Sequence, residues 1–396
     1  MNYTTKKCLI TFIIVLFSMS FLFPSVSSAR NHTSSAASTA SVPSGQYYRS
    51  QEVALHSHVQ KASLYYTTDG SQPTTHSQLY KKPIHIETDT TLKVSAYKNR
   101  HRLATSTYNY RFVTREDIAS SFLSFEYQGM PYRLYIPKNH KRGKAYPLVL
   151  FLHGGGERGT DNQKQLLAND GAVLWASPEV QKKHPSYVLA PQARNAVDGG
   201  FALTRNVQNE IDLTNVFQFS PDLHKAYDVL QHVLTSYQID QKRIYATGLS
   251  QGGFGTYQLN ITYPRLFAAM IPIAGGADPS KAGILASKPI WAFHAEDDSI
   301  IPISYARNTI QAIQKAGGQP LYTEYASKYG YDHASWTPAY ETPGLTDWLF
   351  AQRRSFDKQK PIHLLTRRIG FFCFICQNDE QNALLVRCIR LAGKSL

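Results

Sequence analysis

Residues 243–253, RIYATGLSQGG, place a serine between two glycines at the end of a short apolar run. The apolar residues predict a strand, and the glycines predict a sharp turn into a helix, which would hold Ser250 in a strained backbone conformation with its hydroxyl exposed. Gly248 and Gly252 suit this turn because a Cβ at either position would collide across it. The G-x-S-x-G pattern therefore predicts a nucleophile elbow with Ser250 as the nucleophile.

Two segments downstream of Ser250 supply an acid and then a histidine, the chain order expected of such a nucleophile. Residues 289–294 indicate a buried strand, and Asp298 follows at its carboxyl end. His333 stands in a polar loop after a strand-like run at 321–325. A serine hydroxyl is a poor nucleophile near neutral pH, so we expect His333 to take its proton and Asp298 to hold the imidazole in the required tautomer. This chemistry requires no metal and no organic cofactor.

A glycine-rich loop upstream predicts the part of the site that would stabilise an anion. Residues 146–152 form a continuous apolar run, typical of a central parallel strand, and HGGG follows at 153–156. The backbone N–H of Gly154 or Gly155, together with that of Gln251, is expected to form an oxyanion hole. The alternative is a flexible turn. A phosphate loop is disfavoured because no G-K-[ST] sequence follows.

Three further side chains near these motifs are candidates for substrate contact. Glu157 and Arg158 follow the glycines directly, and Trp336 stands three residues after His333. Glu157 and Arg158 have a second interpretation, in which they pair with one another or with Asp161 as surface ions.

Six motifs occur in order between residues 118 and 352. They are YRLYIP at 132–137, LHGGGERG at 152–159, LAPQ at 189–192, GLSQG at 248–252, the segment from FH at 293–294 through Asp298 to Pro302, and HASW at 333–336. Together they resemble the secreted α/β-hydrolases related to polyhydroxybutyrate depolymerases and to feruloyl and acetyl xylan esterases, a group that includes predicted peptidases. The resemblance implies that the acid is Asp298 rather than Asp297, because the family's acid stands four residues after the histidine of the penultimate strand.

The middle of the chain predicts an α/β fold. Between residues 147 and 353, apolar strand-like runs alternate with amphipathic stretches, which indicates a mainly parallel sheet with helices on both faces. Apolar residues from Leu223 to Tyr237 recur at helical spacing and predict one helix just before the elbow strand. We therefore predict an α/β-hydrolase domain over residues 113–352, with its catalytic groups on loops at the carboxyl ends of strands.

The N-terminal residues predict export. Residues 1–29 have two lysines, an apolar stretch and then small residues ending in VSSA, which is typical of a cleaved signal peptide. An uncleaved membrane anchor is the alternative, disfavoured because the apolar stretch is short. Residues 30–41, rich in Ser, Thr and Ala, predict a linker. We expect a secreted or periplasmic protein with no stable membrane insertion after the signal is removed.

Residues 42–112 change in character to short alternating segments separated by turns, which predicts a small immunoglobulin-like β-sandwich. The segment YYTTDGSQPT at 65–74, with Tyr80 and TTLK at 90–93, resembles the immunoglobulin-like module found at the C-terminal end of chitobiases. That module often accompanies carbohydrate-active enzymes, so the resemblance favours a polysaccharide substrate. The alternative role is that of a rigid spacer.

Residues 353–396 form a basic tail with nine Lys and Arg against three Asp and Glu, a large share of the chain's net charge of +14. Because the positive charge is concentrated in a tail without a binding motif, we expect no nucleic-acid partner. The tail also holds Cys373, Cys376 and Cys388, and their spacing with His363 fits no standard zinc pattern. A disordered or non-native extension is the prediction for this segment.

Three functions are consistent with these features. The first is a secreted serine carboxylesterase that removes acyl groups, such as acetyl or feruloyl groups, from a polysaccharide. The second is a serine peptidase of the prolyl-oligopeptidase type, ranked lower because the sequence lacks a propeller. The third is a carbohydrate-binding wall protein with a vestigial hydrolase.

Overall fold

The coordinates are a computed structural model that describes residues 38–138, 140–206, 208, 210–214, 216–354, 372–377 and 384–389. The predicted signal peptide, 1–29, and most of the linker lie outside the described residues. The chain divides into two compact units, one ending at Phe112 and the other beginning at Val113.

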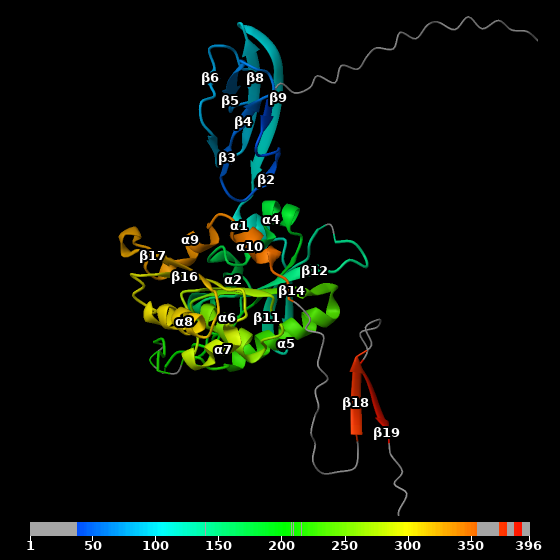
Figure 1. The fold of residues 1–396 in the computed structure, drawn as a ribbon, viewed down its shortest axis with the longest axis vertical. Coiled ribbons are helices and arrows are strands. Elements are labelled where there is room, and N and C mark those ends of the chain that lie inside the picture. The colour runs from blue at the N-terminus through cyan, green and yellow to red at the C-terminus, as the bar shows by residue number, and fades with distance from the viewer. Residues whose placement is uncertain are drawn as a thin grey trace, which may run out of the picture. The chain divides into compact units, whose positions relative to one another are not determined.

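The first unit is a β-sandwich, which confirms the predicted immunoglobulin-like module (Figure 1). One sheet has five strands in the order β2-β9-β8-β5-β6, and β3–β7 and β1–β4 form two-stranded pairs. In β8 the side chains of Leu92, Val94 and Ala96 are fully buried, because alternate residues of a strand point to the same face. The strands are β1 (Ser38–Ala40), β2 (Gly45–Tyr47), β3 (Gln51–Val53), β4 (Leu55–Ser57), β5 (Ser63–Thr67), β6 (Gln78–Leu79), β7 (Ile84–Ile86), β8 (Thr90–Lys98) and β9 (His101–Phe112).

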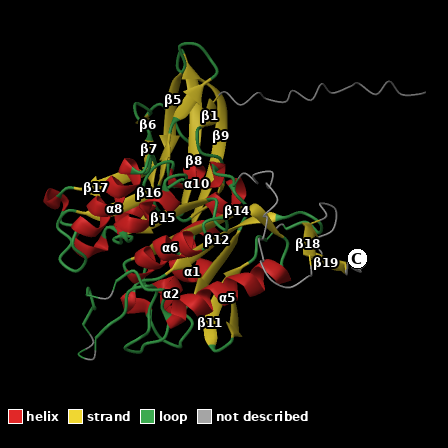
Figure 2. Cartoon of the chain, turned by 60° about the horizontal axis from the view of Figure 1, so that its bottom comes forward, coloured by secondary structure: helices red, strands yellow, loops and turns green. Residues whose placement is uncertain are grey.

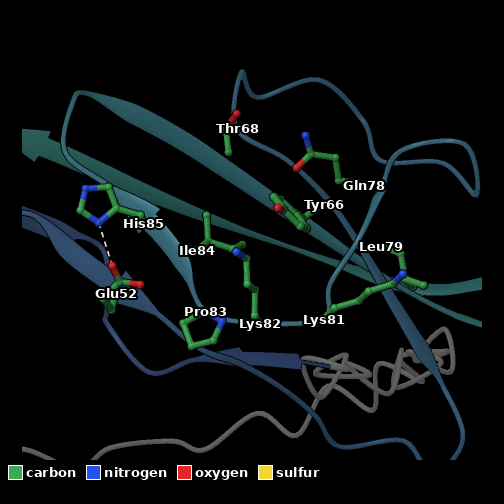
Figure 3. A pocket seen from close by; sticks show the side chains of 10 residues that line it. All are labelled: Glu52, Tyr66, Thr68, Gln78, Leu79, Lys81, Lys82, Pro83, Ile84 and His85. Carbon is green, nitrogen blue, oxygen red and sulfur yellow. Dashed lines mark hydrogen bonds and ion pairs between the residues drawn. The ribbon is translucent and has the colours of Figure 1, made fainter.

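An open depression of about 810 Å³ lies in this sandwich, between the two-residue strand β6 and the pair β3–β7. Figure 3 shows the side chains around it: the Tyr66 ring lies beside Gln78, and His85 contacts Glu52. Lys81 and Lys82 belong to the connection between β6 and β7, so the depression is lined by aromatic, amide and cationic groups.

The second unit is built on an eight-stranded sheet in the order β10-β11-β13-β12-β14-β15-β16-β17. The pairs β10–β11 and β11–β13 are antiparallel, and the remaining pairs are parallel. The strands are β10 (Leu123–Tyr127), β11 (Met130–Tyr135), β12 (Tyr146–Leu152), β13 (Tyr187–Pro191), β14 (Ile239–Leu249), β15 (Ala269–Ile273), β16 (Trp291–Ala295) and β17 (Leu321–Tyr325).

Helices cover both faces of this sheet (Figure 2). The α-helices are α1 (Arg115–Ala119), α2 (Lys164–Leu167), α3 (Val173–Ala176), α4 (Pro178–Lys183), α5 (Pro221–Ser236), α6 (Gln251–Thr262), α7 (Ala282–Leu285), α8 (Ser304–Lys315), α9 (Trp336–Tyr340) and α10 (Leu345–Ala351). Four 3₁₀ turns are η1 (Gly155–Glu157), η2 (Pro279–Lys281), η3 (Ser327–Tyr329) and η4 (Asp332–Ala334).

Alternation along β14 explains why both faces are buried. Ile244 and Ala246 belong to the core that includes apolar residues of α5 and α6. Tyr245 points to the opposite face, where its ring meets Phe350 of α10 edge-on at 5.5 Å. The predicted α/β-hydrolase fold is therefore confirmed, including the predicted helix before the elbow strand, which is α5. Ser220 caps the start of α5 by accepting the N–H of Leu223.

The strand order places a crevice beside the elbow. The chain passes from β12 to β13 on one side and then returns to β14 on the other side of β12. In open parallel sheets, ligands bind at the carboxyl ends of the strands where the order reverses in this way. The loops after β12 and β14 meet at that point, and they carry the glycine-rich segment and Ser250.

The basic tail is described in part. The strands β18 (Phe372–Gln377) and β19 (Leu384–Ile389) pair antiparallel, and the other residues from 355 onward lie outside the described residues. The disordered tail therefore stays a prediction. Within the described parts of the chain, no helix combines the length and the apolar character needed to cross a membrane.

Candidate active site

Ser250 occupies the turn between β14 and α6. Its backbone has φ 53° and ψ −121°, a positive-φ conformation that residues with a Cβ rarely adopt. The Ser250 N–H donates to the Ile273 carbonyl of β15 at 2.9 Å, which holds the strained turn against the neighbouring strand. A Cβ at Gly252 would overlap the Leu152 carbonyl oxygen, and one at Gly248 would overlap the Gly252 carbonyl oxygen. Both glycines are needed because the helix passes this close to the strands.

We expect Gly252→Ala to lower the free energy of unfolding by about 3 kcal/mol, because the added methyl group would push α6 away from the end of β12. Gly283→Ala is the matched control. Gly283 also lies in a helix, and apart from its chain neighbours and its own helix backbone no described atom lies within 4 Å of a Cβ built there. Its replacement should be neutral or stabilise by up to about 1 kcal/mol. Denaturant unfolding of both variants measures the difference, and equal effects would contradict this account of the elbow.

The three residues predicted to act together lie within hydrogen-bonding distance of one another. Ser250 Oγ is 3.0 Å from His333 Nε2. His333 Nδ1 is 2.9 Å from Asp298 Oδ2 and 3.0 Å from Asp298 Oδ1. Because the carboxylate only accepts hydrogen bonds, Nδ1 carries a proton and Nε2 is left to accept one from Ser250. Asp297 is turned elsewhere and accepts the N–H of Asp332 at 3.2 Å.

Asp298 is held as a carboxylate by donors on every side. Its Oδ1 accepts the backbone N–H groups of Ile300 at 3.0 Å and Ile301 at 2.8 Å. Burial alone would raise the pKa of Asp298, but hydrogen bonds from His294, from His333 and from the N–H of Ile301 lower it well below its ordinary value. The acid is therefore ionised throughout the neutral range.

The loops that carry the acid and the histidine are tied together. The Ser299 N–H donates to Asp332 Oδ1 at 2.7 Å, one residue before His333. Asp332 has φ 46°, which is rare for a residue with a side chain, and it begins the short turn η4 that presents the imidazole. The Trp336 ring lies edge-on to the His333 ring at 5.2 Å. In the structure Trp336 contacts the imidazole and is not among the residues that line the cavity beside Ser250, so its contact with substrate stays a prediction.

A cavity of about 540 Å³ opens beside Ser250. Its wall includes two of the three predicted oxyanion residues, Gly155 and Gln251, while Gly154 is buried behind them. The described residues that complete the lining are Gly156, Arg205, Glu210, Ile211, Leu213, Ser299, Ile300 and His333. Only His333 of this group could be predicted from the sequence. Arg205, Glu210, Ile211 and Leu213 lie on the connection from β13 to α5, which shows no periodic pattern.

Glu157 and Arg158 point into the protein rather than into the cavity, with only 7% and 5% of their surface exposed. Glu157 Oε1 accepts a hydrogen bond from Asn169 Nδ2 at 2.8 Å. Burial raises the pKa of the Glu157 carboxyl, although hydrogen bonds from backbone N–H groups and from Asn169 oppose the shift. Neither residue lines the cavity, so their contact with substrate stays a prediction, and neither lies at the surface as the second interpretation required.

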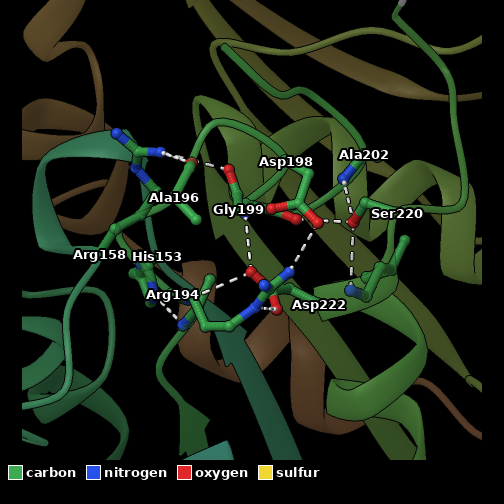
Figure 4. A network of polar contacts seen from close by, with 12 residues as sticks. His153, Arg158, Arg194, Ala196, Asp198, Gly199, Ala202, Ser220 and Asp222 are labelled. Carbon is green, nitrogen blue, oxygen red and sulfur yellow. Dashed lines mark hydrogen bonds and ion pairs between the residues drawn. The ribbon is translucent and has the colours of Figure 1, made fainter. Parts of the chain in front are cut away.

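Arg158 belongs to a network that shapes the loop after β13 (Figure 4). Its guanidinium donates to the carbonyls of Gly155 at 3.0 Å and Ala196 at 2.8 Å, so it joins the glycine-rich loop to that neighbouring loop. Fully buried Asp222 accepts hydrogen bonds from Arg194 Nε at 2.7 Å and from the Gly200 N–H at 3.1 Å. The network holds the backbone around the cavity, and the sequence pattern gave no sign of it.

His153 holds the start of the glycine-rich loop. Its Nε2 accepts the N–H of Ala193 at 2.9 Å, so Nδ1 carries the proton and donates to the Gly154 carbonyl at 2.6 Å. Burial lowers the pKa of His153 to about 4, which keeps the imidazole neutral. The carbonyl of Gly154 is thereby turned inward, and the next residue, Gly155, lines the cavity.

Comparison with known proteins agrees with this fold. Residues 139–339 match the model of the family described as phospholipase/carboxylesterase, and residues 42–109 match the chitobiase/beta-hexosaminidase C-terminal domain. The first match covers just over half of the chain. The chain belongs to the phospholipase/carboxylesterase family, whose members are hydrolases of the carboxylesterase type.

Particular relatives fall in the same class. A crystal structure of a thermostable esterase is 32% identical, covers 80% of this chain and 90% of that chain, and superposes with a TM-score of 0.56. The poly(3-hydroxyalkanoate) depolymerase C of Paucimonas lemoignei is 28% identical over 130 residues, 33% of this chain and 28% of that protein. A probable feruloyl esterase C of Aspergillus flavus is 23% identical over 203 residues, 51% of this chain and 63% of that protein. The chain thus spans less than two thirds of the length of either curated relative.

Proposed function

We propose that this protein is a serine esterase that hydrolyses carboxylic esters through an acyl-enzyme formed on Ser250. The observation that carries the proposal is the continuous chain of hydrogen bonds from Ser250 Oγ through His333 to Asp298, with lengths of 3.0 and 2.9 Å. A nucleophile, a base within reach of its proton and an acid that orients the base are the parts that acyl transfer requires.

In the proposed reaction, His333 Nε2 takes the hydroxyl proton as Ser250 Oγ bonds to the ester carbonyl carbon. The oxyanion that forms receives the N–H groups of Gly155 and Gln251, which line the cavity beside Ser250. The C–O bond to the alcohol then breaks, and His333 returns the proton to the departing oxygen. Water repeats the two steps on the acyl-enzyme and releases the acid, which leaves Ser250 free again.

We infer that the natural esters are acyl groups, such as acetyl or feruloyl groups, on a polysaccharide outside the cell. Support comes from the match of the first unit to a domain of chitobiases and hexosaminidases, and from the probable feruloyl esterase among the relatives. The export signal predicted for residues 1–29 agrees with an extracytoplasmic substrate.

A panel of substrates tests the reaction class. The full chain should hydrolyse p-nitrophenyl acetate and methyl ferulate and should release acid from acetylated xylan. A fluorophosphonate should label Ser250, as located by mass spectrometry of the digested protein. Faster cleavage of peptide anilides than of these esters would favour a peptidase. Folded protein with neither turnover nor label would favour a binding protein and refute the esterase.

If the substrate is a polysaccharide, we expect the depression in the first unit to bind it. Tyr66 packs partly against the apolar core of the first unit and presents a partly exposed ring among polar and apolar side chains, a surface on which a sugar ring can stack. We expect Tyr66→Ala, made in the inactive Ser250→Ala chain, to weaken retention on insoluble xylan by about tenfold, since one such contact is worth about 1.4 kcal/mol.

The matched control is Tyr65→Ala. Tyr65 precedes Tyr66 on β5, points to the opposite face and packs against Tyr97 at 5.5 Å. Retention should be unchanged in this variant. Equal retention of all three chains would leave the first unit as a spacer and contradict binding at this depression.

A further inference from the structure

His294 is a fully buried histidine on β16 that has no part in the proposed reaction steps. Its Nε2 lies 3.0 Å from the Ile301 carbonyl oxygen and 3.1 Å from Asp298 Oδ2. Both neighbours are acceptors, so Nε2 must carry a proton that it shares between them. Its Nδ1 is buried and has no hydrogen-bond partner among the described residues.

The Nε2–H completes the donors around the catalytic carboxylate. Oδ1 of Asp298 accepts the N–H groups of Ile300 and Ile301, whereas Oδ2 is shared by His294 and His333. The terminal torsion of an aspartate is soft, so the plane of its carboxylate is set by hydrogen bonds rather than by rotamer preference. Without His294, only His333 would hold Oδ2.

The same proton also closes the loop that carries the acid. Through the Ile301 carbonyl, His294 links the end of β16 to the far end of the segment that contains Asp298. A buried histidine can simply fill space in a core, but an apolar side chain would do so without leaving a ring nitrogen unpaired. The contacts of Nε2 with Asp298 and the Ile301 carbonyl therefore indicate a role for the polar ring beyond packing.

We propose that His294 is a positioning residue whose Nε2–H fixes the plane of the Asp298 carboxylate toward His333 Nδ1. The proposal rests on the Ser250–His333–Asp298 esterase mechanism above. It predicts that losing this donor slows the chemical step and leaves substrate binding unchanged, because no atom of His294 lines the cavity described beside Ser250.

The experiment compares His294→Leu with His294→Gln in the full chain. Leucine removes the donor, and we expect kcat to fall about 100-fold with KM changed less than about threefold, the scale seen when a catalytic group loses its alignment. The glutamine amide can place an N–H near the position of Nε2 and should keep kcat within about fivefold of the wild type. Should the leucine variant not fold, His294→Asn replaces it, because its shorter amide cannot reach Asp298.

Two further readouts separate positioning from general structural support. In an Asp298→Asn background, His294→Leu should lower kcat by less than about a further threefold, because the carboxylate that His294 positions is already gone. The far-downfield proton resonance of His333 Nδ1–H should persist in the glutamine variant and move or vanish in the leucine variant. Equal losses with leucine and glutamine, or an undiminished loss in the Asp298→Asn background, would overturn the proposal. Failure of the esterase mechanism itself would appear differently, as a wild-type chain without ester turnover or label at Ser250.

Discussion

Ser250→Ala is expected to lower kcat/KM for p-nitrophenyl acetate by about 10⁴-fold or more. The hydroxyl of Ser250 is the atom that would form the acyl-enzyme, and alanine leaves His333 with no proton to accept. The oxyanion donors and the cavity remain, so substrate should still bind. Initial rates over a range of substrate concentrations, together with the disappearance of fluorophosphonate labelling, measure the loss.

The variant should fold as the wild type does, which makes the result interpretable. Alanine keeps the Cβ and the backbone hydrogen bond to Ile273, and it loses only the 3.0 Å contact with His333. Ser280→Ala, at an exposed position in η2, is the control and should keep full activity. More than about 1% residual activity in purified Ser250→Ala would show that another group is the nucleophile.

The fold could be predicted because several separate sequence patterns each indicate the same fold. The apolar run of β12, the glycines that flank Ser250 and the helical spacing before β14 each demand the same α/β arrangement. The order of serine, acid and histidine along the chain then limits which residues can meet at the carboxyl ends of the strands. Asp298 and His333 could be named because each follows a recognisable strand.

The remainder of the site depends on packing between distant segments. Glu157 and Arg158 look like surface ions in the sequence, yet Asn169 and the loop after β13 enclose them. Asp222 of α5 likewise accepts a hydrogen bond from the N–H of Gly200, some twenty positions earlier. No periodic pattern in the sequence predicts that contact. Which glycine of the loop after β12 lines the cavity could not be predicted either, since the hydrogen bond from His153 to the Gly154 carbonyl depends on three-dimensional placement.

Asp298 differs from Asp297 in the hydrogen-bond donors that surround its carboxylate. These donors predict how the amide of an Asp298→Asn variant would be oriented. In an Asp298→Asn variant, the side-chain oxygen should face Ile300 and Ile301, whose N–H groups point at Oδ1. The amide nitrogen would then take the place of Oδ2 beside His333 and His294. His333 Nδ1 would have to accept a hydrogen bond where it now donates one.

Asp298→Asn should therefore lower kcat by about 10³- to 10⁴-fold while leaving KM nearly unchanged. The imidazole would be held with its proton on Nε2, the tautomer that cannot take a proton from Ser250, and the charge that stabilises the imidazolium would be lost. Asp297→Asn removes the same charge one residue away, can still accept the Asp332 N–H, and should change kcat by less than about threefold. Steady-state kinetics near neutral pH, where Asp298 is ionised, compare the two variants. A similar loss in both, or a loss in Asp298→Asn that appears only in KM, would mean that net charge near the cavity matters and that the orientation of His333 does not.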